Sequence, residues 1–190
     1  MKKLALALGL ASLSLAAQAS DLSYSNVGVS YLDGDLANLD ADGYALDASI
    51  AISDSFFIDG SYSRLEADDI NAEADQYSLG LGFHAPITPT ADLVIGASWL
   101  RADVEACVGP FCASEDGNGW GADAGVRWLI TPQFEANIFL GYADVEDEDD
   151  TAISVGARYF ITPMFSVDGG YSSANDADTD IWNVGLRYHF

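Results

Sequence analysis

Apolar and polar side chains alternate along most of this 190-residue chain. The pattern is clearest in its last nine residues, WNVGLRYHF, where large apolar side chains occupy every second position from Trp182 to Phe190. Successive side chains of a β-strand point to opposite faces, so such a segment has one apolar face and one polar or minimal face. A helix would need apolar residues at every third or fourth position. The alternation therefore predicts an all-β protein built from two-faced strands.

Ten segments carry the alternation, and the joints between them are of two kinds. The segments cover residues 22–32, 43–53, 56–66, 75–86, 91–102, 118–130, 134–145, 151–161, 165–174 and 180–190. Four joints are short turns, at 52–56, 87–91, 130–134 and 161–165, and three of them contain Ile-Thr-Pro. The other five joints, at 33–42, 66–75, 103–116, 144–150 and 174–180, are longer and acidic. Because the two kinds alternate strictly, all short turns are expected at one end of an antiparallel sheet and all acidic loops at the other.

The amino-terminal residues and the charge balance indicate an exported protein. Residues 1–19 combine Lys2 and Lys3 with an apolar run from Leu4 to Ala17, which predicts a signal peptide followed by one domain over 20–190. The remaining chain has no lysine and five arginines against 30 acidic residues, a formal charge of −25. Such a balance disfavours nucleic acids and anionic membrane surfaces as partners and makes cations the natural counterpart.

Two residue groups raise the question of metal binding. Cys107 and Cys112 share one Gly-Pro-containing segment, and in an oxidising compartment they are predicted to form a local disulfide rather than to bind metal or act as thiols. The first acidic loop holds four hard oxygen ligands suited to Ca²⁺, namely Asp33, Asp35, Asp40 and Asp42, but their spacing does not match an EF-hand. We expect no cofactor, with divalent cations at the acidic loops as the alternative.

Aromatic residues at the ends of the apolar face indicate which solvent that face meets. In nine of the ten strands the apolar-face residue nearest the acidic loop is Tyr or Trp. These residues are Tyr31, Tyr44, Tyr62, Tyr77, Trp99, Trp120, Tyr142, Tyr171 and Trp182. Amphipathic rings gather at a membrane interface, whereas a soluble sandwich would expose the Gly- and Ser-rich face to water. We therefore predict a closed antiparallel up-and-down transmembrane β-barrel of ten strands, with eight strands as the alternative.

Together with the terminal Tyr188-His189-Phe190, this pattern resembles the small outer-membrane β-barrel family that includes the OmpA transmembrane domain and OmpX-like proteins. The resemblance implies a bacterial outer-membrane protein with both termini in the periplasm, surrounded by membrane lipid and lipopolysaccharide. It also implies that Tyr188 and Phe190 belong to the signal that the outer-membrane assembly machinery reads. Ten strands depart from the eight of those relatives, so no specific function is carried over.

The opposite face carries charged residues that would line the barrel lumen. They are Arg127, Arg158, Arg187, Asp47, Asp59, Asp123, Glu135 and Asp168. Counting outward from the short turns places Arg158 opposite Asp168, and Arg127 opposite Asn137 with Glu135 on the diagonal. Such residues either fill the barrel as a structural ion-pair network or form a constriction that selects ions. Inward phenylalanines at positions 57, 139 and 160 favour the filled lumen.

No catalytic residues are predicted. The only histidines, His84 and His189, fall on the inward face near the short turns. We therefore predict a non-catalytic envelope protein that is structural or engages in surface interaction or adhesion with an extracellular partner. A narrow porin-like channel for small solutes or cations is the first alternative. An outer-membrane enzyme acting on lipid or protein is the second.

Overall fold

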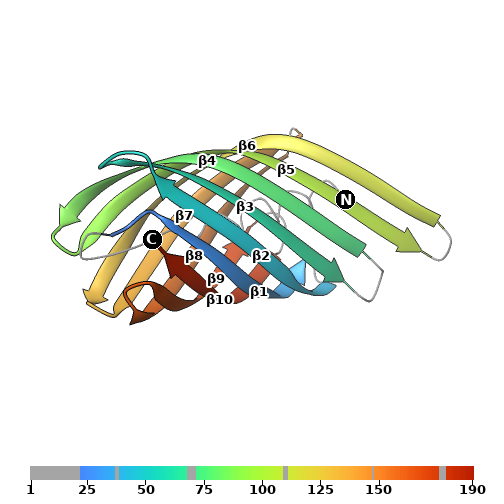
Figure 1. The fold of residues 1–190 in the computed structure, drawn as a ribbon. Helices are drawn as coiled ribbons and strands as arrows, with labels where there is room; N and C mark the ends of the chain where they lie inside the picture. Colours follow the sequence, from blue (N-terminus) through green and yellow to red (C-terminus); the bar gives the residue numbers. More distant parts are fainter. Residues whose placement is uncertain (1–21, 37–38, 68–71, 109–110, 147, 176–178) are drawn as a thin grey trace.

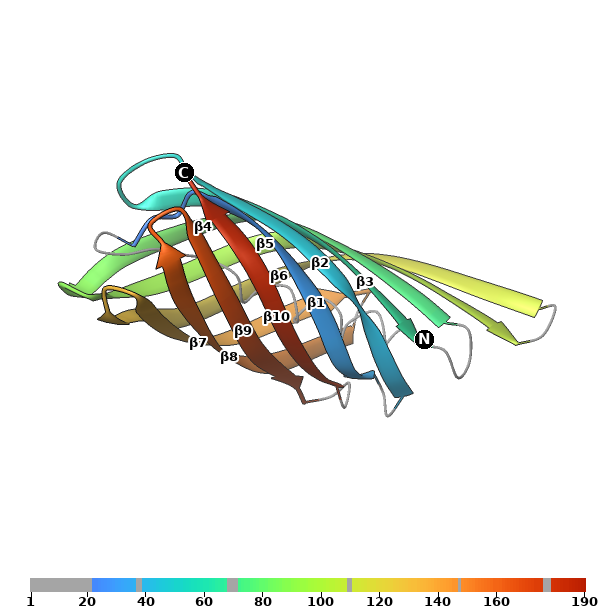
Figure 2. The ribbon, with the colours of Figure 1, turned by 60° about the horizontal axis from the view of Figure 1, so that its bottom comes forward.

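The computed structural model of this chain describes residues 22–36, 39–67, 72–108, 111–146, 148–175 and 179–190. These residues form one closed, antiparallel β-barrel (Figures 1 and 2), which confirms the predicted fold class and the number of ten strands. The strands are β1 (Asn26–Leu36), β2 (Leu39–Ala51), β3 (Phe56–Ala67), β4 (Ala72–Thr88), β5 (Ala91–Val108), β6 (Phe111–Thr131), β7 (Phe134–Val145), β8 (Glu148–Thr162), β9 (Phe165–Ala174) and β10 (Thr179–His189). The predicted signal peptide lies outside the described residues. The described residues include no helix with the length and apolar character needed to cross a membrane.

The barrel closes because its last strand pairs with its first. β10 runs antiparallel to β1, from Asn26 opposite His189 to Asp35 opposite Asp180. Every other pairing joins strands that follow each other in the chain. Closure gives the backbone N–H and C=O groups of the wall their partners within the sheet, which a strand with no water on its outer face requires.

Three of the four short turns are built in the same way. In each of these turns a threonine hydroxyl accepts a hydrogen bond from the backbone N–H two residues later. The distances are 3.2 Å for Thr88, 3.3 Å for Thr131 and 3.2 Å for Thr162. The isoleucine before each threonine is skipped in the strand pairing as a bulge, and the proline after it has no N–H to continue the ladder. We call the end of the barrel with residues 52–55, 89–90, 132–133 and 163–164 the short-turn end, and the opposite end the hairpin end.

At the hairpin end the prediction of long acidic loops is wrong, because the strands continue through most of those segments. β5 extends to Val108 and β6 begins at Phe111, so the acidic segment 103–116 is almost entirely sheet. The segments 33–42, 66–75, 144–150 and 174–180 are likewise shortened by strand residues at both ends. Figure 1 shows the β5–β6 hairpin reaching farther than its neighbours at this end.

The alternation persists through these extensions, but its polarity inverts. Along β5 the outward side chains change from Ile95 to Trp99 and then to Asp103, while the inward ones change from Gly96 to the buried Val104. This change of side chains is expected where the outer surroundings of a strand change from apolar to aqueous and its inner surroundings become a packed core. The aromatic residue marks the level at which the change occurs.

Candidate functional site: aromatic girdle, closed lumen and acidic hairpins

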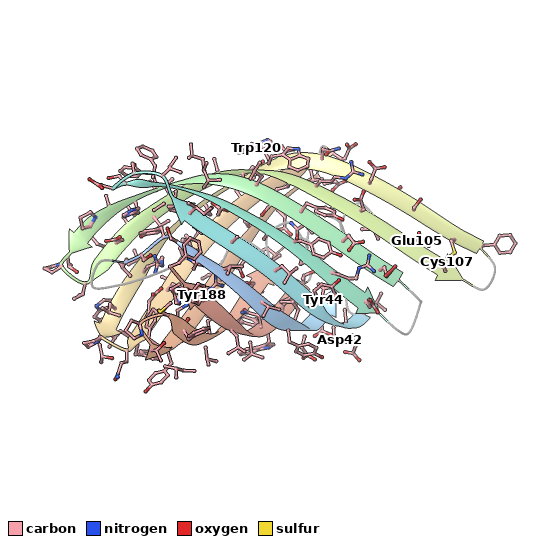
Figure 3. The ribbon with its side chains drawn as sticks, in the orientation of Figure 1. Asp42, Tyr44, Glu105, Cys107, Trp120 and Tyr188 are labelled. Atoms are coloured by element: carbon pink, nitrogen blue, oxygen red, sulfur yellow. A yellow bond between two sulfur atoms is a disulfide. The ribbon has the colours of Figure 1, made fainter. Side chains whose placement is uncertain are left out.

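The nine aromatic residues predicted for the membrane interface all lie on the outer face of the barrel. Several are direct register partners: Tyr31 with Tyr44, Tyr62 with Tyr77, Trp99 with Trp120, and Tyr171 with Trp182. Figure 3 labels Tyr44 and Trp120, whose side chains are 43% and 52% exposed. The nine residues form a girdle near the hairpin end of the wall.

Between this girdle and the short-turn end the outer face is apolar. Leu79, Leu140 and Leu186 are 58%, 64% and 61% exposed, which water would not favour for such side chains. A second group of outward aromatics lies near the short-turn end: Phe56, Phe83, Trp128, Phe134, Tyr159, Phe165, Tyr188 and Phe190. An apolar band between two aromatic rings is the surface that a barrel presents to lipid.

Inside the barrel, the predicted arginines take part in a buried ion-pair layer. Arg127 donates to Glu135 at 2.7 Å, and Arg158 lies between Glu135 and Asp168 at 3.9 and 3.6 Å. Arg158 is the register partner of Asp168, and Arg127 that of Asn137, as counted from the turns. The charged side chains are nearly inaccessible, at 0–7% exposure. Because buried charges require partners, the pairs fix these side chains across the lumen.

Arg187 extends the layer over the neighbouring strands. It contacts Asp168 at 3.2 Å and Asn26 at 2.5 Å, and it pairs with Asp47 two strands away. Gly28 lies between Arg187 and Asp47 in the register, and a Cβ there would stand 2.8 Å from the Asp47 carboxylate and 3.0 Å from the guanidinium. The missing side chain therefore makes room for an ion pair that crosses β1.

The two other predicted lumen residues do not join this layer. Asp59 on β3 and Asp123 on β6 both point inward and are half-buried. In the part of the chain that the structure describes, neither has an ion pair or a hydrogen bond. Six of the eight predicted residues are thus brought together, and these two stand apart.

Sequence reasoning missed a cluster around Tyr24 at the short-turn end. Its ring stacks on Phe57 and His84 with centroid distances of 4.8 and 3.8 Å, and the Arg127 guanidinium lies 4.9 Å from its centroid. Its hydroxyl donates to Asp92 at 2.9 Å, and His84 Nδ1 lies 3.1 Å from the same oxygen. A cavity of about 500 Å³ adjoins these groups. Tyr24, two residues before β1, keeps the inward parity of Asn26 and Gly28, and Asp92 has the inward parity of β5, so the sequence contains a signal for both.

The second histidine makes a contact that resembles part of a catalytic dyad. His189 Nε2 lies 2.8 Å from Ser166 Oγ, as a base and its nucleophile would. Both residues are buried, at 2% and 1% exposure, and His189 Nδ1 has no hydrogen-bond partner among the described residues. No third group orients the ring and the serine is closed to a substrate, so the pair does not have the geometry of a triad.

At the hairpin end the lumen is filled by apolar side chains. Two buried clusters line it: Leu32, Ala41, Ala45, Leu65, Ala67, Ala72, Ala74, Ala102, Val104 and Ile181 in one, and Leu100, Ala143, Val145, Ala152 and Ala174 in the other. Leu65, Leu100 and Val104 are 1–2% exposed. Inward residues around a water-filled passage would be wetted, so this packing closes the lumen at the hairpin end.

The outer face of the hairpin end is strongly acidic. Asp33 and Asp42 are register partners on β1–β2, as are Asp35 and Asp40, and Glu66 follows opposite Asp42. Among the described residues, the one group with metal-ligand spacing consists of Glu105, Cys107 and Cys112, and its sulfur atoms are bonded to each other. The calcium site proposed from Asp33, Asp35, Asp40 and Asp42 therefore stays a prediction.

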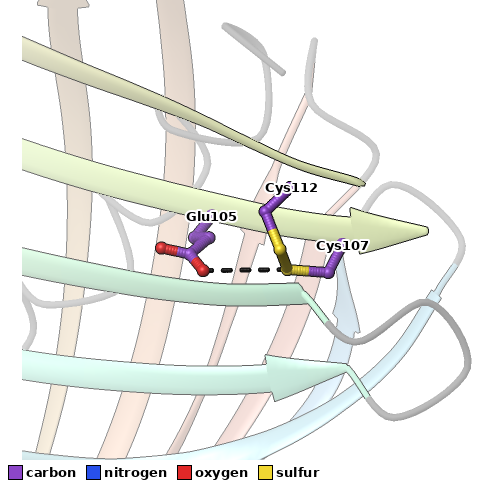
Figure 4. The surroundings of a disulfide bond; sticks show 3 residues. All are labelled: Glu105, Cys107 and Cys112. Atoms are coloured by element: carbon purple, nitrogen blue, oxygen red, sulfur yellow. Dashed lines mark hydrogen bonds between the residues drawn. A yellow bond between two sulfur atoms is a disulfide. The ribbon is translucent and has the colours of Figure 1, made fainter. Parts of the chain in front are cut away.

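The predicted disulfide between Cys107 and Cys112 is present (Figure 4). The two residues are register partners on β5 and β6, with Cα atoms 4.1 Å apart, and the Glu105 carboxylate lies 3.7 Å from Cys107 Sγ. The bond therefore joins the two strands of the longest hairpin near its tip, rather than closing a loop as the sequence suggested.

Two outward arginines lie just beyond the girdle, and both are paired. Arg64 donates to Asp75 at 2.6 and 2.8 Å and to Glu73 at 2.7 Å. The hydrogen bonds from Arg64 hold the pKa of Asp75 below its ordinary value, and the same bonds raise the pKa of Arg64. Arg101 pairs with Asp103 at 2.6 Å. The surface beyond the girdle thus remains net negative.

A closed barrel with a lipid-facing band between aromatic rings is an integral membrane protein of the outer-membrane type. The chain belongs to the outer membrane protein beta-barrel domain family, whose profile matches residues 4–154, and its location is the bacterial outer membrane. No curated protein sequence matches it. Among solved structures it is similar to the translocator domain of autotransporter NalP from Neisseria meningitidis, with a TM-score of 0.52 and 11% identity over 97% of this chain and 93% of that one.

Two further solved structures are similar to this chain. The attachment invasion locus protein Ail of Yersinia pestis has a TM-score of 0.49 and 13% identity over 88% of this chain and 100% of that one. The KdgM porin, solved in complex with disordered oligogalacturonate, has a TM-score of 0.49 and 10% identity over 86% and 99%. At these identities the likeness concerns the fold alone.

Proposed function

We propose that this chain is a non-conducting, non-catalytic outer-membrane barrel that presents its β5–β6 hairpin to partners at the cell surface. The observation that carries the proposal is the hairpin itself, which continues as regular sheet beyond the girdle and has an unpaired edge. The closed lumen supports the non-conducting part. The buried ion-pair layer around Arg127, Arg158 and Arg187, which we call the arginine layer, fills it at one level, and the apolar clusters fill it at another. The buried His189–Ser166 pair supports the non-catalytic part, because neither side chain is open to a substrate.

The unpaired edge lies on β6 over residues 111–118. β6 pairs with β5 from Phe111 onward, whereas its pairing with β7 begins only at Gly119. All residues from 111 to 116 are exposed. The Cα separation of 4.1 Å between the cysteines is that of a non-hydrogen-bonded pair, so Cys112 directs its N–H and C=O away from β5. By alternation Ser114 and Asp116 do the same, which leaves their backbone groups available to a partner.

The chemistry of this edge defines the kind of partner. An unpaired edge binds an extended peptide segment by strand addition, and the disulfide keeps the edge extended before binding. Glu115 and Asp116 on β6 favour a segment rich in Lys or Arg, as do Asp103, the register partner of Asp116, and Glu105, the register partner of Ser114. The same charges repel a second copy of this acidic chain.

A labelled peptide of alternating Lys and Val tests this proposal by fluorescence anisotropy with the detergent-solubilised barrel. Ser114→Pro removes an N–H from the free edge but none from the β5 ladder, and we expect it to weaken binding about tenfold, or about 1.4 kcal/mol. Ser114→Ala, which keeps the N–H, should bind as the parent does. Equal affinity of the parent and Ser114→Pro would contradict strand addition at this edge.

The proposal also places the hairpin end outside the cell and both termini in the periplasm. In its support, the start of β1 and the end of β10 both lie at the short-turn end, where outer-membrane barrels have their periplasmic turns. Phe190, 62% exposed there, is available as the assembly signal, and the apolar band would contact lipid and lipopolysaccharide. A membrane-impermeant maleimide, added to intact cells after mild reduction, should label Cys107 and Cys112. Labelling only after the cells are broken would reverse the orientation.

A further inference from the structure

Two lumen carboxylates, Asp59 and Asp123, have neither an ion pair nor a hydrogen bond within the described part of the chain. The three lumen arginines balance Glu135, Asp168 and Asp47. Asp59 and Asp123 face the same lumen, and no hydrogen bond or ion pair joins either to another described residue. Burying an unpaired carboxylate is costly, so such groups take up either protons or a cation.

The two carboxyl groups lie over glycines of the two strands between them. Asp59 is opposite Gly80 on β4, and both of its carboxylate oxygens lie 2.8 Å from the place that a Cβ of Gly80 would occupy. Asp123 is opposite Gly96 on β5, and its carboxylate fills the corresponding place there. Gly96 is the register partner of Gly82, the next inward position after Gly80. The carboxyl groups therefore lie at diagonally related inward positions over β4 and β5, and Asp123 experiences the charge of Asp59.

A buried serine occupies the inward position between these strands, with its Oγ 3.2 Å from the place that a Cβ of Gly121 on β6 would occupy. Ser98 on β5 is the register partner of Gly80 and stands two residues from Gly96. It is 8% exposed, and its Oγ has no hydrogen-bond partner in the described part of the chain. At the adjoining inward positions, Ser61 and Ser78 hydrogen-bond to each other at 2.7 Å. These serine side chains thus add oxygen atoms to those of the two carboxyl groups.

We propose that Asp59, Asp123 and Ser98 hold one hard divalent cation inside the lumen. Two carboxylates match the charge of such an ion, and oxygen-only donors select Ca²⁺ or Mg²⁺ over softer metals. Ca²⁺ is the better match, because it accepts irregular oxygen coordination whereas Mg²⁺ demands a near-octahedral shell. The ion would link β3 to β6 across the two glycine-bearing strands.

Retention of calcium after refolding tests the proposal. The chain is refolded from urea into detergent with Ca²⁺, passed by gel filtration into calcium-free buffer, and analysed for bound calcium by mass spectrometry. Ions on the outer hairpins exchange and are removed, whereas an ion in the closed lumen is released slowly. We expect the parent to retain calcium, Asp59→Asn/Asp123→Asn to lose it, and Asp33→Asn/Asp42→Asn, which removes an outer pair, to retain it.

Two results would overturn the proposal. One is equal retention by the parent and the Asp59→Asn/Asp123→Asn variant. The other is no retention by the parent. Stability that rises as the pH falls would then show that the two carboxyl groups take up protons instead. If the double variant does not refold, Ser98→Ala provides the second measurement. We expect this variant to release calcium faster than the parent. An unchanged release rate would contradict the site.

Discussion

Replacing Arg187 with methionine tests whether the arginine layer stabilises the barrel. Arg187 is 1% exposed and contacts Asp168, Asn26 and Asp47. Methionine keeps much of the volume but no charge, so the variant leaves the buried Asp47 without its cation and Asp168 with Arg158 alone. Removing one partner of a buried ion pair costs about 3–5 kcal/mol, and we expect Arg187→Met to reduce the free energy of unfolding by that amount.

Urea unfolding in phospholipid vesicles, followed by tryptophan fluorescence, measures this loss. Arg101→Gln is the matched control, because Arg101 pairs with Asp103 on the exposed outer face, where ion pairs contribute little. Adding Asp47→Asn to Arg187→Met removes the unpaired charge of Asp47 and should restore part of the stability. If Arg187→Met unfolds at the same urea concentration as Arg101→Gln, the reasoning about buried pairing is refuted.

Three other predictions concern the wall, the hairpin and pH. Gly125→Ala would push a Cβ into the Phe139 ring and the Ile138 carbonyl and should cost about 1–3 kcal/mol in the same assay, whereas Gly169→Ala on the open outer face should be neutral. Cys107→Ser/Cys112→Ser should speed proteolysis of the β5–β6 tip, because losing the disulfide lowers the local stability by about 2 kcal/mol. The barrel should keep its heat-modifiable gel mobility. An unchanged cleavage rate would show that the disulfide does not stabilise the tip. Because Arg64 lowers the pKa of Asp75 in the folded state, that pair stabilises the fold above the unfolded pKa of about 4 and is lost as the pH falls through the folded value. Arg64→Gln should therefore flatten the acid side of the melting-temperature profile, and an identical profile would show that the pair does not matter.

The features predicted correctly from the sequence are those set by local geometry. Side-chain parity along a strand is fixed over two residues, so Trp99 and Trp120 could be placed on the outer face before their pairing was known. A short turn fixes the register of the strands that it joins, so Arg158 could be placed opposite Asp168. Both inferences need only positions close together in the chain.

The features that were missed depend on surroundings that are distant in the chain. Asp103 and Glu105 suggest a loop by composition, yet the inward Ala102 and Val104, which alternate with them, continue the pattern with inverted polarity. Recognising that inversion requires knowing where the lipid ends. Likewise, Arg187 reaches Asp47 across an intervening strand, a contact that no turn count predicts.

Single-channel recording of the refolded barrel in planar bilayers tests the central claim most directly. With the arginine layer and the apolar clusters both in place, we predict insertion without conductance steps in solutions of monovalent or divalent salt. Insertion is verified in the same preparation by its heat-modifiable gel shift. Reproducible unitary steps from the folded protein, absent after heat denaturation, would contradict the closed lumen and restore the channel as the function.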